Sequence, residues 1–317
     1  MTPKDFEALA DKVRNWGRWG PDDQCGTLNH ISPEALMRGV AAAKVGKRFS
    51  LGLRFDRNGP QTGSGRRFNP LLYPTELFAP MGASTGGGKG GRSYYSDDVI
   101  HMPLQAATQW DALAHVHYDG VLYNGCKACD TLTVHGALRN GVEHMAEVGI
   151  MSRGVLLDFC RHRGVDELPI DYAISVDDLE AVCEAQGVQV EPGDVVLVRT
   201  GHIRCFTLRS DRKAFNGLQP GLSPACAEWL YERKVAAVGA DNLAVEVLTA
   251  EMFASFMPLP FHQLALRDMG CPLGEMFNLE RLAQDCADDN RYAFLFSAPP
   301  LAVTGAVGSP VNPLVLK

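Results

Sequence analysis

The sequence lacks the features that would direct the chain to a membrane or to nucleic acid. No apolar run approaches the ~20 residues of a membrane-spanning helix. The first residues show no secretory signal pattern, so we expect a cytoplasmic protein. The net charge of −7 gives no electrostatic support for a nucleic-acid partner. The nine cysteines are scattered, and Cys126 and Cys129 have no second Cys-x-x-Cys pair, which indicates reduced thiols and no zinc site there.

Internal repeats and a Gly/Ser linker are also missing. The composition, 46% hydrophobic and 21% charged over 317 residues, is ordinary for a globular chain with a sizeable core. We therefore predict a helical extension over residues 1–45 and one domain over residues 46–317.

Local signals predict the elements before residue 100. Thr2-Pro3 and Ser32-Pro33 are typical helix starts, an N-cap followed by proline. Apolar residues alternate over residues 48–55, which predicts a half-buried strand. Residues 56–96 are rich in Gly, Pro, Ser and Asn and predict a long loop, of the kind that serves as a lid or an interface arm.

The remainder alternates between strand and helix. A capping box at Ser175 predicts a helix that ends before Gly187, and Ser223-Pro224 starts another helix. Short apolar runs predict strands at residues 154–158, 194–200, 235–241, 292–298 and 310–316. Short buried strands with flanking helices indicate an α/β layered domain.

Polar side chains are concentrated between residues 105 and 117. Side chains two apart on a strand, or four apart on a helix, share a face, so several donors converge in either case. Imidazole and carboxylate groups are ligands for a divalent metal. The donors are Gln105, Gln109, Asp111, His115 and His117.

Together with a later segment that contains His262, Glu275 and Asn278-Leu279, this segment resembles the cyclase family of metal-dependent hydrolases, which includes bacterial kynurenine formamidases. The family pattern is His-x-Gly-Thr-His-x-Asp-x-Pro-x-His. Thr108, Asp111 and His115 match it, whereas Gln105 and Gln109 stand where the family has histidines. Trp16-Gly-Arg-Trp-Gly looks like the start of a longer subgroup with this glutamine variant.

The resemblance implies a fold and a set of roles. It sharpens the fold to a swivelling β/β/α layered fold with a barrel-like sheet core. It implies that Asp111, His262 and Glu275 bind metal and that His115 is the general acid/base. Because glutamine carries no charge, we expect one Zn²⁺ or Mn²⁺ per chain. Gln105 and Gln109 would be weak ligands or hydrogen-bond donors to substrate.

Further residues are candidates for supporting roles. Thr108 would orient a ligand, and Trp110 would line the core or the pocket. His117 would supply a missing imidazole, and Asp241 lies at the end of a predicted strand, a common place for functional side chains. The implied activity is hydrolysis of a small amide, cyclic amide, formamide or lactone, as in an arylformamidase-like or lactone hydrolase.

Other interpretations of the same residues stay open. A metal-dependent lyase, isomerase or dehydratase would need the same histidine, and a metal-free binding protein would need no metal at all. Asp111 and His115 would alternatively form a buried pair, His262 would only cap a helix, and Glu275 would be a solvated carboxylate. By resemblance we also expect a homodimer or homotetramer, formed through residues 56–96 and the N-terminal helices.

Overall fold

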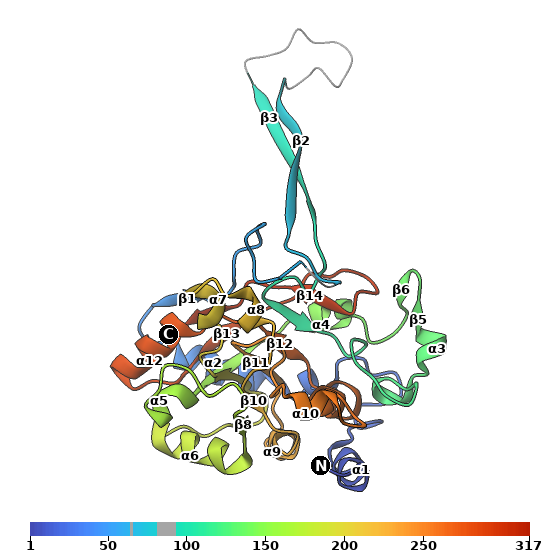
Figure 1. The fold of residues 1–317 in the computed structure, drawn as a ribbon, viewed down its shortest axis with the longest axis vertical. Helices are drawn as coiled ribbons and strands as arrows, with labels where there is room; N and C mark the ends of the chain where they lie inside the picture. Colours follow the sequence, from blue (N-terminus) through green and yellow to red (C-terminus); the bar gives the residue numbers. More distant parts are fainter. Residues whose placement is uncertain (64–65, 81–92) are drawn as a thin grey trace.

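The computed structural model describes residues 1–63, 66–80 and 93–317 and centres on one curled nine-stranded sheet (Figure 1). Four central strands are parallel, and the strands on both flanks are antiparallel to their neighbours. In spatial order the strands are β1 (Arg48–Ser50), β15 (Leu314–Leu316), β13 (Ala293–Ser297), β7 (Met151–Asp158), β9 (Val195–Arg199), β11 (Ala237–Ala240), β12 (Leu273–Glu275), β4 (Gln109–Asp111) and β14 (Gly308–Pro310).

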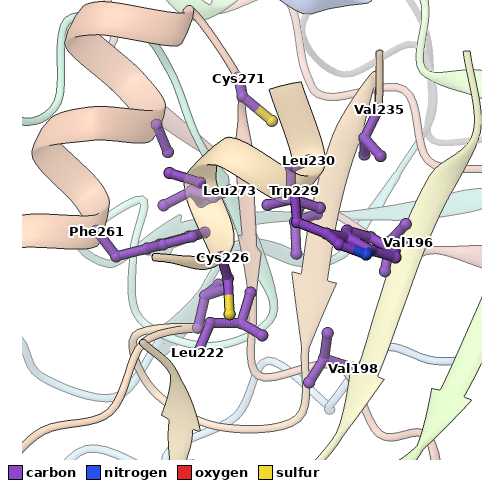
Figure 2. Close-up of a cluster of buried hydrophobic side chains, with 14 of the residues drawn as sticks. Val196, Val198, Leu222, Cys226, Trp229, Leu230, Val235, Phe261, Cys271 and Leu273 are labelled. Carbon is purple, nitrogen blue, oxygen red and sulfur yellow. The ribbon is translucent and has the colours of Figure 1, made fainter. Parts of the chain in front are cut away.

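The central strands are buried on both faces because helices and loops cover them. Along β9 the side chains alternate between two hydrophobic clusters, Val196 and Val198 on one side and Val195 and Leu197 on the other. Figure 2 shows the first cluster, where Trp229 and Leu230 of α9 (Cys226–Glu232) pack against the sheet. The uninterrupted apolar runs in the sequence therefore mark strands that are buried on both faces.

Helices surround the sheet, and several begin where the sequence predicts. Thr2 and Ser175 form capping boxes at α1 (Pro3–Val13) and α6 (Val176–Gln186). The other α-helices are α2 (Pro33–Ala42), α3 (Ala128–Thr131), α4 (Val142–Val148), α5 (Phe159–Arg163), α7 (Arg204–Thr207), α8 (Arg212–Phe215), α10 (Ala250–Phe253), α11 (Pro260–His262) and α12 (Glu280–Asp289). Within the described ranges, no helix combines the length and hydrophobicity of a membrane span.

Short elements complete the fold. They are the 3-10 turns η1 (Gly26–His30) and η2 (Tyr123–Gly125), the π-helix η3 (Gln263–Met269), and the two-stranded pairs β8 (Ala173–Ile174) with β10 (Gly221–Leu222) and β5 (Leu132–Thr133) with β6 (Gly136–Ala137).

A long hairpin corrects the predicted loop over residues 56–96. β2 (Leu71–Pro80) pairs antiparallel with β3 (Tyr94–His101) and projects far from the body of the molecule (Figure 1). Pro74 in β2, register shifts after Pro74 and Glu76, and apolar side chains on both faces conceal the strand pattern in the sequence. Part of that segment, residues 64–65 and 81–92, lies outside the described residues.

Three smaller predictions also need correction. The strand expected over residues 48–55 ends at Ser50, and the helix expected from Ser223 begins at Cys226. The single closing strand expected over residues 310–316 is two strands, β14 and β15, at opposite sides of the sheet. The strands predicted near residues 154–158, 194–200, 235–241 and 292–298 are confirmed as β7, β9, β11 and β13.

Candidate metal centre

Two neighbouring strands bring the first donors together. β4 pairs antiparallel with β12, with Gln109 opposite Glu275 and Asp111 opposite Leu273. Because alternate side chains on a strand share a face, Gln109 and Asp111 face the same side as Glu275. Trp110 between them belongs to the opposite face. There it packs against Phe277 and Phe296, and its indole N–H donates to the Ala298 carbonyl at 2.8 Å. Trp110 is therefore part of the core.

His262 approaches this pair from a short helix. Pro260 occupies the first turn of α11, and Phe261 is buried in the cluster of Figure 2, which fixes the neighbouring His262. The chain continues directly into the π-helix η3. Such π segments are rare and occur frequently at functional sites. His262 does more than cap a helix, since its ring is enclosed by carboxylates.

Asp111, His262 and Glu275 form a compact buried cluster. One ligand atom from each lies within 4.8 Å of the others. Nε2 of His262 is 3.3 Å from Oε1 of Glu275 and 3.7 Å from Oδ2 of Asp111. Glu275 is only 3% exposed, so the interpretation of this residue as a solvated carboxylate is wrong.

The charges in this cluster leave a place for a cation. Burial and the adjacent Glu275 raise the pKa of Asp111 well above its ordinary value. Burial opposes a charge on His262, but hydrogen bonds to Glu246 and Glu275 outweigh it and raise its pKa to about 10. Oδ2 of Asp111 and Oε1 of Gln109 are buried without a hydrogen-bond partner among the described residues. Unpartnered buried oxygens beside a second carboxylate fit a divalent metal.

Gln109 and Gln105 occupy different surroundings. The Gln109 amide Nε2 donates to Glu275 at 2.5 Å and to Asp111 at 3.3 Å, so it links the two carboxylates. Gln105 is half-buried, and its amide Nε2 lies against Gly308 on β14, where a Cβ would approach it to 2.7 Å. Gln109 therefore sits within the cluster, and Gln105 lies beside it on the β14 side.

His115 lies next to the cluster with a neutral ring. Its Nε2 is 3.6 Å from Oδ1 of Asp111, and its side chain is 20% exposed. Burial lowers the pKa of His115 to about 4, so its imidazole is uncharged at neutral pH. His117 is half-buried and makes no hydrogen bond within the described part of the chain. His115 thus has the position and protonation state of a proton acceptor, whereas His117 lies outside the compact cluster.

Thr108 fixes the backbone beside Glu275. Its hydroxyl donates to the Met276 carbonyl at 2.6 Å and accepts from the Leu53 N–H at 2.8 Å. Met276 has a φ of 59°, a left-handed conformation that is costly for a residue other than glycine. Thr108 therefore acts on the backbone that carries Glu275.

Glu246 is a functional neighbour that the sequence analysis missed. Its Oε1 lies 2.5 Å from His262 Nδ1 and accepts the His262 backbone N–H at 2.9 Å, and its Oε2 accepts the Phe261 N–H at 3.1 Å. The preceding Val245 has a φ of 57°, held by a hydrogen bond from its N–H to Asn242 Oδ1. The sequence offered one signal for Glu246, which is that its carboxylate is flanked by apolar residues.

The sequence analysis also missed Arg67. Nη1 of Arg67 is 4.0 Å from Oε2 of Glu275, which places a guanidinium next to the cluster.

Asp241 follows β11 and accepts hydrogen bonds from Thr200 N–H, Thr200 O–H and Gly201 N–H at 2.6–2.8 Å. With both oxygens satisfied, Asp241 stabilises the turn after β9 and is not part of the cluster.

Comparisons with known proteins agree with this architecture. A family model described as putative cyclase matches residues 31–247. The crystal structure of a novel cyclase is 36% identical with a TM-score of 0.86, over 97% of this chain and 99% of its own. Isatin hydrolase A from Ralstonia solanacearum is 21% identical, with a TM-score of 0.61 over 89% of this chain and 95% of its own. An isatin hydrolase bound to the product analogue thioisatinate is 17% identical, with a TM-score of 0.62 over 90% of this chain and 99% of its own. No curated protein matches the chain by sequence.

Proposed function

The chain belongs to the putative cyclase family, and we propose that it is a metal-dependent hydrolase of a small amide, cyclic amide, formamide or lactone. The observation that carries the proposal is the buried cluster of Asp111, His262 and Glu275, in which one oxygen of Asp111 has no hydrogen-bond partner among the described residues. Structures that share this fold include proteins described as isatin hydrolases, and isatin is a cyclic amide, which supports that substrate class.

Asp111, His262 and Glu275 would hold one Zn²⁺ or Mn²⁺. When bound, such an ion supplies Lewis-acid polarisation of a carbonyl oxygen and a lowered pKa for water. Gln109 keeps the two carboxylates in place through its amide N–H groups. Half a turn of that amide exchanges its nitrogen and oxygen, so the same side chain has an oxygen to offer as a weak ligand.

His115 would carry the proton. Its neutral ring accepts a proton from the attacking water and returns it to the departing amine or alkoxide. Nε2 is close enough to Asp111, at 3.6 Å, to work beside the ligands without being one of them. Arg67 would pair with the carboxylate that ring opening produces, because its guanidinium lies 4.0 Å from Glu275 at the same place.

Turnover in ¹⁸O-labelled water tests the proposal. The chain, loaded with Mn²⁺ or Zn²⁺, is assayed on a panel of formamides, lactones and cyclic amides that includes isatin. We expect one labelled oxygen in the product carboxylate. A product formed without label would assign the site to a lyase or isomerase and contradict hydrolysis.

Two histidine variants test the role of His115. His115→Ala should lower kcat by about 10²–10⁴-fold with metal content unchanged. His135→Ala, an exposed histidine in the β5–β6 turn, is the matched control and should keep full activity. Full turnover in His115→Ala would remove the histidine from the mechanism.

A further inference from the structure

The π-helix that continues from His262 ends in carbonyl groups that the helix itself cannot satisfy. The last four carbonyls of a helix have no partner within it, and a buried carbonyl without a hydrogen bond is costly. All seven residues of η3 are buried. Because π-helices are rare and mostly limited to a single turn, the surroundings have to hold η3 in this form.

Residues 14–27 of the N-terminal extension supply the missing donors, and we call them the clamp. Four consecutive carbonyls, from residue 267 to residue 270, each accept a hydrogen bond from the clamp at 2.7–2.9 Å. The pairs are Trp16 Nε1 with Arg267, Asn15 N with Asp268, Asn15 Nδ2 with Met269, and Thr27 N with Gly270. The clamp therefore caps the end of η3.

Side chains hold the same end of η3. The guanidinium of Arg267 lies over the rings of both Trp16 and Tyr118, 4.7 and 3.8 Å from their centres. A cation over an aromatic face is attracted to it. The carboxylate of Asp268 is fully buried and accepts hydrogen bonds from Arg14 and Tyr118 at 3.2 and 2.8 Å. Two side chains of the clamp thus fix two side chains of η3.

The backbones of the clamp and η3 also lie against each other. A Cβ at Gly26 would overlap the carbonyl oxygen of Gly270, so only glycine fits at this point of the clamp. A Cβ at Gly270 would in turn overlap the ring of Tyr123, whose hydroxyl donates to Asp23 at 2.8 Å. The end of η3 therefore has no space in which to move relative to the clamp.

We propose that the clamp positions His262 through η3 and that Trp16 is a positioning residue, a role that rests on the metal site proposed above. A π-helix bonds each N–H to the carbonyl five residues before it, and an α-helix to the carbonyl four residues before it. With the clamp released, a return of η3 to α winding would shift its two ends relative to each other by about one residue, or ~1.5 Å. Nε2 of His262 lies 3.3 Å from Glu275 and 3.7 Å from Asp111, so a shift of this size would remove it from the cluster.

Hydrogen exchange in the metal-free chain tests the coupling without any metal. Trp16→Phe keeps an aromatic ring beside Arg267 and removes the indole N–H. The amides of residues 262–270 should then exchange about three- to tenfold faster, the factor that corresponds to the loss of one hydrogen bond. Unchanged exchange at His262, or faster exchange confined to residues 267–270, would overturn the proposal.

Trp19→Phe is the matched control, because it is the same substitution in the same segment. Trp19 packs on Arg18 and His30 and makes no hydrogen bond to η3 in the described part of the chain. Its exchange rates over residues 262–270 should equal those of the wild type. Thr27→Val, which keeps the shape of the side chain and removes a hydroxyl that donates to Gly270, should act in the same direction as Trp16→Phe.

Metal affinity gives the second readout. Chelator competition should show that Trp16→Phe binds Mn²⁺ about tenfold more weakly than the wild type, and that Trp19→Phe binds it equally well. Unchanged Mn²⁺ affinity in Trp16→Phe would overturn the positioning role. A wild type without affinity for Mn²⁺ would contradict the proposed metal site alone, and the exchange rate at His262 would still decide whether the clamp holds it.

Discussion

The metal cluster and the β2–β3 hairpin place carboxylates under opposite conditions. Asp111 and Glu275 are buried, lie on adjacent strands and are held by groups from the same chain, chiefly Gln109 and Thr108. Glu76 and Asp97 also lie on adjacent strands, yet they are exposed and nothing in the described chain neutralises them. The body of the molecule fixes the first pair, whereas the second pair is open to solvent.

Left-handed backbone conformations lie next to two carboxylates of the candidate metal centre. Val245 and Met276 adopt left-handed conformations next to Glu246 and Glu275 and are fully buried. Such conformations persist only where the surroundings over-determine them, here through Asn242 and Thr108. The backbone that carries Glu246 and Glu275 is thus fixed by hydrogen bonds from the same chain, and such support is what a catalytic metal site requires.

Removing one ligand charge should have the largest effect. Asp111→Asn keeps the shape of the side chain but removes the charge that binds metal, so turnover should fall by at least the ~10²–10⁴-fold expected from loss of the acid/base. Steady-state kinetics in saturating Mn²⁺ measures this. Asp119→Asn, an exposed aspartate on the same segment, should behave like wild type. An active Asp111→Asn enzyme would refute the ligand assignment.

Weakening the support of His262 should have a smaller effect. Glu246→Gln keeps an oxygen near Nδ1 but removes its charge, so metal affinity should fall about 10–100-fold. Competition with a chelator gives the affinity, and exposed Glu251→Gln is the control. Equal affinity in Glu246→Gln and wild type would reduce Glu246 to a structural role.

The core and the β2–β3 hairpin should differ in their contributions to the free energy of unfolding. Trp110→Ala opens a cavity in the sheet and should lower the free energy of unfolding by ~3–5 kcal/mol. Leu72→Ala in the β2–β3 hairpin should change it by less than ~0.5 kcal/mol, because the side chain is exposed in the single chain. Urea denaturation measures both variants against the wild type. A loss from Leu72→Ala as large as that from Trp110→Ala would contradict the exposure of Leu72.

The pH dependence of activity should lack the falling limb that an ordinary histidine gives. His115 acts in its neutral form, which predominates above its pKa of about 4. With metal saturating, the protonation of His115 should therefore leave activity unchanged near pH 6.5 and lower it only near or below pH 4, since a bound cation would lower the pKa further. A falling limb centred near the ordinary histidine value of ~6.5 would contradict the buried neutral ring.

The sequence predicts the parts of the fold whose causes are local. Val195–Arg199 is an uninterrupted apolar run, and Ser175 supplies its own capping box, so both are recognisable without a structure. The β2–β3 hairpin was mistaken for a loop because its strands lack the apolar–polar alternation that packing on a core would impose. β14 and β15 were merged because their separation depends on distant partners, Trp110 for one and Phe296 for the other.

The candidate metal centre likewise contains residues that the sequence predicts and residues that only the fold brings together. The family resemblance singled out Asp111, His262 and Glu275, and the structure places them within 4.8 Å. Glu246 and Arg67 reach the cluster only through the folded backbone, and no spacing along the chain connects them to it. The opposite faces of β4 also separate Trp110 from its neighbours Gln109 and Asp111, which the motif alone does not reveal.

Elemental analysis of the purified, unchelated chain tests the central claim most directly, with His262→Ala measured in parallel. The account predicts about one Zn or Mn per chain in the wild type and a metal content near zero in His262→Ala. A wild type that holds no metal even after reloading, or a His262→Ala chain that keeps its full content, would contradict it.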